Sequence, residues 1–100
     1  MDSASDSNGN WTFFSNNAHV LVCLTQMFQP TTREIAIRVG ITERAVQRIL
    51  TRLVEAGVLK IKKSGRRNCY ELDLQRQLRH PLESHKTIGE FLQLINHDGG

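Results

Sequence analysis

The chain has 100 residues, 39% of them hydrophobic and 23% charged, a composition that fits one small soluble domain and leaves no room for two. No run of about 18 apolar residues is present, and the opening stretch MDSASDSNGN is polar and acidic, which argues against a membrane span and a secretory signal. Two distant cysteines without a CxxC pair suit a reducing compartment, so we expect a cytoplasmic protein.

The net charge of +3 is unevenly distributed along the chain. Residues 33–67 hold ten Arg or Lys against three Glu, a balance of +7, and the remaining residues hold three basic against seven acidic, a balance of −4. Such a concentration of positive charge indicates a surface for a polyanion, of which nucleic acid is the commonest. A solvated basic face without a partner is the alternative.

The first predicted helix follows a polar tail. Residues 1–12 contain little that a core could bury, so we expect them to be mobile. Ser15 or Asn16 is suited to cap a helix that reaches about Phe28, and Pro30 prevents its continuation. Its apolar positions are Val20, Leu21, Leu24 and Met27 or Phe28, which lie on one helical face.

Two more helices are predicted on either side of a glycine turn. Residues 31–34 have the capping-box form Thr-x-x-Glu, which marks a helix start. Gly40 stops this short helix because glycine adopts the left-handed conformation at little cost. Thr42 then caps a third helix, which extends to about Ala56 and is ended by Gly57.

A hairpin is predicted next. Residues 58–63 and 68–74 alternate apolar and polar side chains, the period of a strand, and the segment between them contains Gly65. The connecting turn is flanked by lysines and bears two arginines. We therefore expect two antiparallel strands with a basic tip.

The last predicted helix opens at Pro81, which suits the first position of a helix, and carries an apolar stripe. This stripe exceeds what the edge of so small a core needs, and Gly89 within it indicates a close backbone approach. We expect residues 82–96 to pack on the first helix and on the same helices of a second subunit, giving a twofold dimer. The expected interface residues are Leu82, Ile88, Gly89, Phe91, Leu92 and Ile95. Packing within one chain is the alternative.

Residues 31–50, TTREIAIRVGITERAVQRIL, meet the requirements of two helices that cross steeply. The apolar contacts between the two helices come from Ile35, Val39, Ile41, Val46 and Ile49. Ala36 is small where the helices must approach closely, and Gly40 lies at the turn. On the third helix the polar residues Arg44, Gln47, Arg48 and Thr51 lie opposite the apolar ones. A helix fits the DNA major groove, where Arg pairs with guanine and Gln with adenine, and a basic hairpin suits the minor groove.

The chain resembles the winged helix-turn-helix transcriptional regulators, particularly compact bacterial ones of the MarR-like and ArsR-like kind. The resemblance covers about residues 15–95 and is carried by REIAIRVGITERAVQRILTRLVEAGVLK, residues 33–60, and GRRNCYEL, residues 65–72. It implies a recognition helix from Thr42 to Arg52, a wing from Lys62 to Asn68, and a homodimer that represses or activates transcription. MarR-like proteins are usually longer, and the ArsR-like paired-cysteine metal motif is missing.

The expected fold is mainly α with a small β-hairpin (α+β), a winged helix-turn-helix with a three-helix core, a wing and a C-terminal dimerisation helix. We expect a tail at 1–12, the DNA-binding domain at 13–74, the helical dimerisation segment at 75–96 and a second tail at 97–100. The residues expected to contact double-stranded DNA are Arg33, Thr42, Glu43, Arg44, Gln47, Arg48, Thr51, Arg52, Lys62, Lys63, Arg66, Arg67 and Asn68. Such a protein would be nucleoid-associated. No metal, cofactor or membrane contact is expected, and a small-molecule effector is compatible with the sequence but not indicated by it.

The cysteines and histidines are predicted to have minor roles. Cys23 is expected to be a small buried hydrophobe. Cys69 is expected to point outward near two arginines, where a redox switch of the wing is an alternative. His80, Glu83 and His85 lack a usual zinc spacing, which favours structural or surface roles for the two histidines.

Other functions fit the sequence less well. A winged helix that binds protein rather than DNA would need exposed apolar or aromatic side chains on the third helix, which has hardly any. RNA binding would need an aromatic platform. An enzyme would need a phosphate loop, a nucleophile motif or a carboxylate pair, none of which the sequence contains, so we expect no enzymatic activity.

Overall fold

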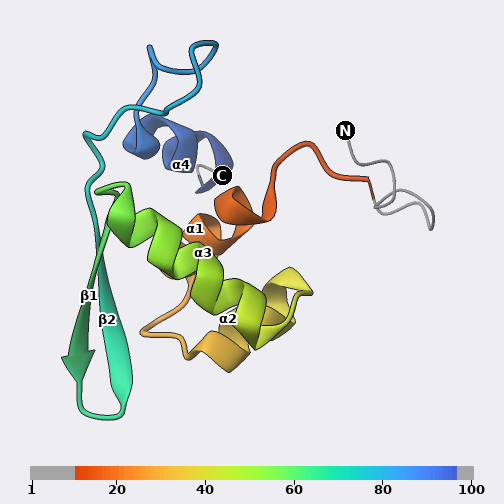
Figure 1. The fold of residues 1–100 in the computed structure, drawn as a ribbon, viewed down its shortest axis with the longest axis vertical. Helices are drawn as coiled ribbons and strands as arrows, with labels where there is room; N and C mark the ends of the chain where they lie inside the picture. The colour runs from red at the N-terminus through yellow and green to blue at the C-terminus, as the bar shows by residue number, and fades with distance from the viewer. Residues whose placement is uncertain (1–10, 97–100) are drawn as a thin grey trace.

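The computed structural model describes residues 11–96, which form four helices and one two-stranded antiparallel hairpin (Figure 1). The helices are α1 (Asn16–Gln26), α2 (Thr32–Val39), α3 (Glu43–Glu55) and α4 (Ile88–Asn96), and the strands are β1 (Leu59–Ser64) and β2 (Arg67–Leu72). This arrangement confirms the expected fold class, a mainly α winged helix-turn-helix with a small β wing. Of the expected tails at 1–12 and 97–100, residues 1–10 and 97–100 lie outside the described residues, and Trp11 and Thr12 are exposed.

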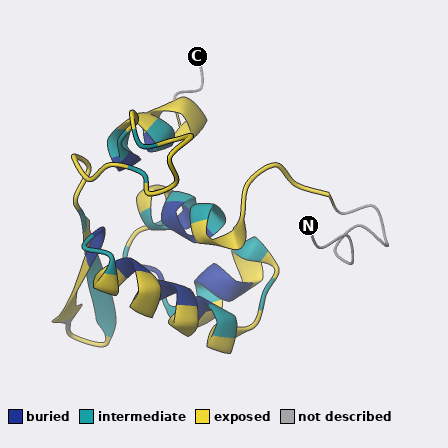
Figure 2. Cartoon of the chain, turned by 45° about the horizontal axis from the view of Figure 1, so that its top comes forward, coloured by how far each residue is buried: buried dark blue, intermediate teal, exposed yellow. Residues whose placement is uncertain are grey.

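The hydrophobic core lies where the first three helices meet. Val20 of α1, Ile35 of α2 and Val46 of α3 are each 0% exposed. α4 packs on α1 and adds Ile88 and Leu92 to the same core. Figure 2 shows that α3 turns its buried side toward the other helices and its exposed side to solvent. The helical spacing of the apolar residues therefore predicted the buried faces of α2 and α3 correctly.

The turn between α2 and α3 forms as the sequence predicts. Thr31 Oγ1 accepts from the Glu34 amide at 3.0 Å, and the Glu34 carboxylate accepts from the Thr31 amide at 2.9 Å, which completes the capping box. Gly40 ends α2 with a φ of +88°, a conformation that suits glycine. Thr42 caps α3 by accepting from the Ala45 amide at 3.0 Å.

α1 ends two residues earlier than the periodicity suggests. Its last helical residue is Gln26, and Phe28, expected near the helix end, is exposed. Gln29 turns the chain with a φ of +42°, an unusual value for a residue with a side chain, before the buried Pro30. The left-handed turn at Gln29, rather than the proline alone, redirects the chain into α2.

The hairpin is close to the prediction but shorter at its end. Leu59 pairs with Leu72 and Ser64 with Arg67. β1 therefore starts and ends one residue later than predicted, and β2 starts one residue earlier and ends two residues earlier. β2 stops at Leu72 because Asp73 turns the backbone, with its carboxylate accepting from the Gln75 amide at 3.1 Å.

The last helix starts later than predicted, which corrects the expectation of a helix opening at Pro81. Residues 81–85 form turns, and Leu82 is exposed. The actual start is a second capping box. Thr87 Oγ1 accepts from the Glu90 amide at 3.2 Å, and the Glu90 carboxylate accepts from the Thr87 amide at 2.9 Å. A backbone bridge between Gln77 and Thr87 closes the loop that precedes this start.

Gly89 marks a close approach of backbones within the chain. Its amide donates to the Leu74 carbonyl at 2.9 Å, and a Cβ at position 89 would lie 3.0 Å from that same oxygen. The glycine therefore serves the packing of α4 on the segment after β2.

The substitution Gly89→Ala should lower the stability of the folded chain. Helix propensity alone predicts a gain of about 1 kcal/mol from this change. The added methyl would instead press on the Leu74 carbonyl and Cβ, and the hydrogen bond from position 89 holds that carbonyl in place. Thermal unfolding followed by circular dichroism measures the sign. A higher Tm for the variant would show that the Leu74 segment yields without cost.

Candidate nucleic-acid interface

The outward face of α3 consists of long polar side chains. Arg44, Gln47, Arg48 and Thr51 are all exposed, as predicted, while the opposite face of the helix enters the core. No ion pair within residues 11–96 engages Arg44 or Arg48. The Thr51 hydroxyl donates to the Gln47 carbonyl of its own helix at 3.0 Å. The face therefore presents two unpaired guanidinium groups and an amide side chain to solvent.

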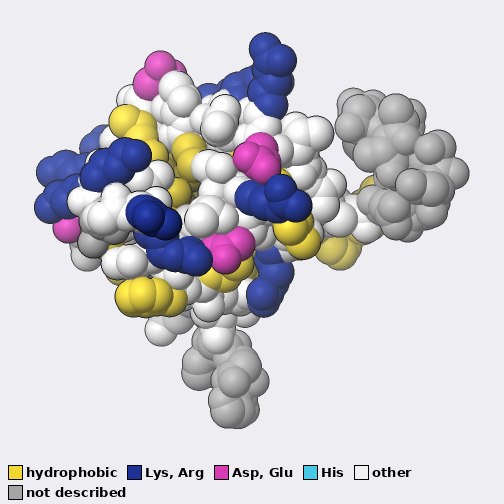
Figure 3. All heavy atoms as spheres, turned by 90° about the horizontal axis from the view of Figure 1, so that it is seen from below, with side chains coloured by type: hydrophobic (Ala, Val, Ile, Leu, Met, Phe, Trp, Pro, Cys, Tyr) yellow, Lys and Arg dark blue, Asp and Glu magenta, His cyan; other side chains and the backbone are white. Residues whose placement is uncertain are grey.

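The hairpin adds a second group of cations. Lys60, Lys63 and Arg66 are exposed, and none of them forms an ion pair in the described part of the chain. Lys62, an expected DNA contact, instead lies 3.1 Å from the carboxylate of Glu71 across the hairpin. Figure 3 shows Lys and Arg side chains gathered toward the hairpin end of this side of the molecule and spaced across the rest of it, with acidic groups among them.

Arg67 is placed differently from the prediction. We expected it beside Arg66 as a free cation of the wing tip. Its guanidinium is half-buried against the start of α2, where it donates to the Gln29 carbonyl at 2.8 Å and to the Glu34 carboxylate at 3.0 and 3.4 Å. Arg67 is therefore not a free cation, because it joins the wing to the helix-turn-helix.

The ion pair between Arg67 and Glu34 shifts the pKa of both side chains. The guanidinium, by hydrogen bonding, lowers the pKa of the Glu34 carboxyl below its usual value, and the Thr31 amide contributes in the same direction. The carboxylate in turn raises the pKa of Arg67. Because the folded state lowers the pKa of Glu34, the resulting stabilisation is present above the ordinary pKa of a glutamate and is lost as the pH falls through the lowered one.

The remaining expected contacts are distributed over α2, α3 and β2. Arg33 is exposed in the first turn of α2, and Thr42 and Glu43 are exposed at the start of α3. Arg52 is exposed on the flank of α3, where it borders an apolar groove rather than the centre of the polar face. Asn68 is half-buried and donates to the tyrosine hydroxyl two residues further on at 3.4 Å.

Sequence reasoning missed two members of this surface. Lys60 is an exposed lysine on β1 that belongs with the other hairpin cations, and strand alternation could have placed it there. Glu34 was identified only as a capping residue. Its pairing with Arg67 spans 33 residues and left no local signal in the sequence.

Most of the residues expected at the dimer interface make packing contacts within their own chain. Ile88 and Leu92 are buried in the core, Gly89 meets the backbone after β2, and Phe91 packs edge-on against Phe14 with ring centroids 5.3 Å apart. These four residues therefore pack within their own chain, Ile88 and Leu92 as buried residues and Gly89 and Phe91 as half-buried ones, and their place in a dimer interface stays a prediction. The other two, Leu82 and Ile95, are exposed.

The cysteines differ in environment. Cys23 is buried as predicted, and that burial raises the pKa of its thiol. Cys69 is half-buried rather than outward-pointing, and its Sγ accepts a hydrogen bond from Gln29 Nε2 at 3.0 Å. The loop between α1 and α2 covers the side of β2 that we expected to face solvent.

Residues 11–96 lack two further features. No cluster of three or more His, Cys, Asp or Glu side chains in this part of the chain could hold a metal ion. Within the same residues, no helix is both long and apolar enough to cross a membrane.

Comparison with known proteins agrees with the arrangement of α2 and α3. The model of a family described as winged helix-turn-helix DNA-binding matches residues 30–60, which run from the proline before α2 through α3 into β1. No curated protein and no solved structure matches the chain. The family match supports DNA binding by this segment in general terms and identifies no subfamily.

Proposed function

We propose that this protein is a sequence-specific, double-stranded DNA-binding transcriptional regulator that acts as a homodimer. The observation that carries the proposal is the polar outward face of α3, with Arg44, Gln47 and Arg48 free in solvent, in the segment that matches a DNA-binding family. Such a helix fits the major groove, where these side chains pair with base edges.

The wing supplies the second contact of the proposed complex. Lys60, Lys63 and Arg66 carry charges that no carboxylate within residues 11–96 neutralises, so they are available to phosphates or to a narrow minor groove. The α3 face would select the sequence, and the wing would add affinity that depends little on sequence.

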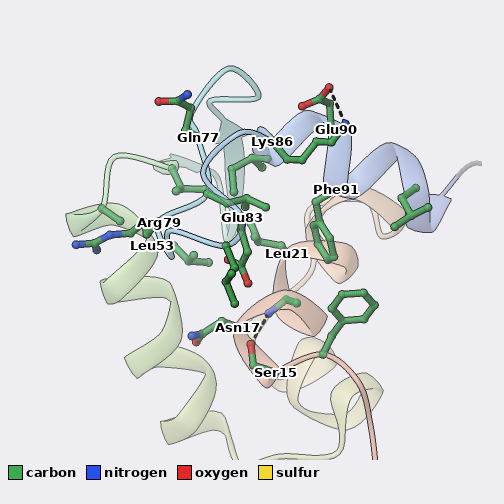
Figure 4. A pocket seen from close by; sticks show the side chains of 18 of the residues that line it. Ser15, Asn17, Leu21, Leu53, Gln77, Arg79, Glu83, Lys86, Glu90 and Phe91 are labelled. Carbon is green, nitrogen blue, oxygen red and sulfur yellow. Dashed lines mark hydrogen bonds and ion pairs between the residues drawn. The ribbon is translucent and has the colours of Figure 1, made fainter.

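An exposed apolar surface supports the proposed dimer. A groove of about 1040 Å³ lies between α1, the C-terminal end of α3 and α4, and Leu21, Leu53 and Phe91 line it from these three helices (Figure 4). Large apolar side chains stand exposed at its rim, with Phe13 at 84%, Leu82 at 81% and Leu94 at 69%. Exposed apolar surface of this kind is typical of an interaction site, and a second copy would cover it.

The test is a selection of bound sequences from random duplex DNA, with the stoichiometry and salt dependence of the complex measured on the winning site. We expect a pseudo-palindromic site bound by two chains. For about 6 to 10 phosphate contacts, the slope of log affinity against log salt should lie near −5 to −9. Light scattering should give about twice the chain mass of 11.4 kDa.

Three results would contradict parts of this proposal. Equal affinity for all duplexes would remove sequence specificity, and a monomer mass at micromolar concentration would remove the dimer. Failure to bind any duplex, with binding to a protein instead, would favour a winged helix used for protein interaction.

A further inference from the structure

Arg67 and Arg66 are neighbours in sequence but lie in different environments. Arg66 is exposed at the turn of the hairpin, and no ion pair in residues 11–96 includes it. The Arg67 guanidinium reaches the start of α2, where two of its nitrogens donate to the two carboxylate oxygens of Glu34 at 3.0 and 3.4 Å. This paired geometry gives directional as well as electrostatic specificity.

Glu34 is itself held in place before it meets Arg67. Its Oε1 accepts from the Thr31 amide at 2.9 Å, and its own amide donates to Thr31 Oγ1 at 3.0 Å. The carboxylate is thereby fixed at the first turn of α2, the helix that packs against α3. Any group that binds Glu34 is held at a defined position relative to the helix-turn-helix.

A second attachment lies beside the first. Gln29 accepts from Arg67 through its carbonyl at 2.8 Å and donates from Nε2 to Cys69 Sγ at 3.0 Å. Its φ of +42° lies in the left-handed region, which residues with a side chain enter at a cost unless their surroundings hold them. Two residues of β2 thus bind one residue of the loop that leads into α2.

From these contacts we infer that Arg67 is a positioning residue, which fixes the angle of the wing relative to the recognition helix by binding Glu34 and Gln29. The inference rests on the proposed function for its consequence in DNA binding. Apart from Arg67 and Cys69, the hairpin meets the body of the protein at its base, where β1 follows α3. The contacts of Arg67 hold the opposite end of the hairpin, so Lys63 and Arg66 are presented at a fixed place beside α3.

The two arginines also differ in whether a carboxylate neutralises their charge. The Glu34 carboxylate neutralises Arg67. Arg67 therefore neutralises no phosphate and displaces no counterion from a bound duplex. Arg66 has no such partner and should release one. The salt dependence of binding therefore distinguishes a phosphate contact from a positioning residue.

The first experiment measures amide hydrogen exchange of the β1 and β2 backbone in the full chain without DNA. Glu34→Gln keeps an oxygen for the Thr31 cap, since glutamine also serves in capping boxes, but it removes the charge that binds Arg67. Glu90→Gln is the matched control, because Glu90 closes the equivalent capping box of α4 and has no contact with the wing. We expect hairpin exchange about fivefold faster in Glu34→Gln, the scale on which a charged hydrogen bond exceeds a neutral one, and unchanged in Glu90→Gln.

The second experiment compares Arg67→Ala with Arg66→Ala on the selected duplex. Both should bind more weakly than the wild type. Arg66→Ala should reduce the magnitude of the salt slope by about 1 for each bound subunit, whereas Arg67→Ala should leave the slope unchanged. Arg76→Ala, which removes an exposed arginine paired with Asp73 in the loop after β2, is the control and should alter neither quantity.

The outcomes separate this inference from the proposed function. Equal hairpin exchange in Glu34→Gln and Glu90→Gln, or equal loss of salt slope in Arg66→Ala and Arg67→Ala, would overturn the positioning role. Failure of the wild-type protein to bind any duplex would overturn the proposed function, while the exchange measurement would still decide whether Arg67 orients the wing.

Discussion

Replacing Arg48 by alanine should weaken binding to the selected duplex by about 1 to 3 kcal/mol and relax the preference at one base pair. Arg48 stands on the exposed face of α3, and no carboxylate within residues 11–96 pairs with it. A guanidinium so placed donates to the two acceptors of a guanine, and alanine cannot replace those hydrogen bonds. Affinities for the selected site and for its single-base variants measure both effects.

Lys63→Ala is the matched control for this prediction. Lys63 is an exposed cation of the wing, also without an ion pair among the described residues. Its loss should weaken binding to all sequences about equally and reduce the salt slope by about 1 per subunit. If Arg48→Ala also weakened binding equally for every sequence, α3 would not be reading bases.

Truncating Ile35 to alanine should destabilise the fold by about 2 to 5 kcal/mol, a large fraction of what so small a domain has available. Ile35 is 0% exposed on the inner face of α2, where it packs between α1 and α3. The change leaves a cavity at the point where three helices meet. Chemical denaturation followed by circular dichroism gives the free energy of unfolding.

The same helix provides the control. Ile37 lies two residues further along α2 and is 71% exposed, so Ile37→Ala should change stability by no more than about 0.5 kcal/mol. Both variants remove the same atoms from the same helix. Equal effects would mean that the helices do not pack as described.

Local signals predicted most of the fold. The capping box at 31–34, Gly40 and Thr42 each determine a backbone conformation through contacts within four residues, and all three stand where expected. The start of α4 carries the same Thr-x-x-Glu pattern at 87–90. The sequence therefore contains the signal for the observed start of α4, but Pro81 and the long apolar stripe led to the prediction of an earlier start.

Long-range contacts left no such signal. A periodic stripe shows that a helix buries one face, but it does not show what covers that face. In α4, Ile88 and Leu92 are buried in the core of their own chain. In the same way, the sequence marks Arg67 as basic and near a turn, and only the folded chain reveals the carboxylate 33 residues away that binds it.

The hairpin turn has a consequence for redesign. Only Gly65 and Arg66 lie between the paired residues Ser64 and Arg67, and Gly65 has a φ of +68°. Extra residues inserted there would cost little loop entropy and would leave the strand register unchanged. The hairpin could thus be lengthened without changing the rest of the fold. Its turn is therefore a suitable site for grafting peptides that would contact a longer stretch of duplex.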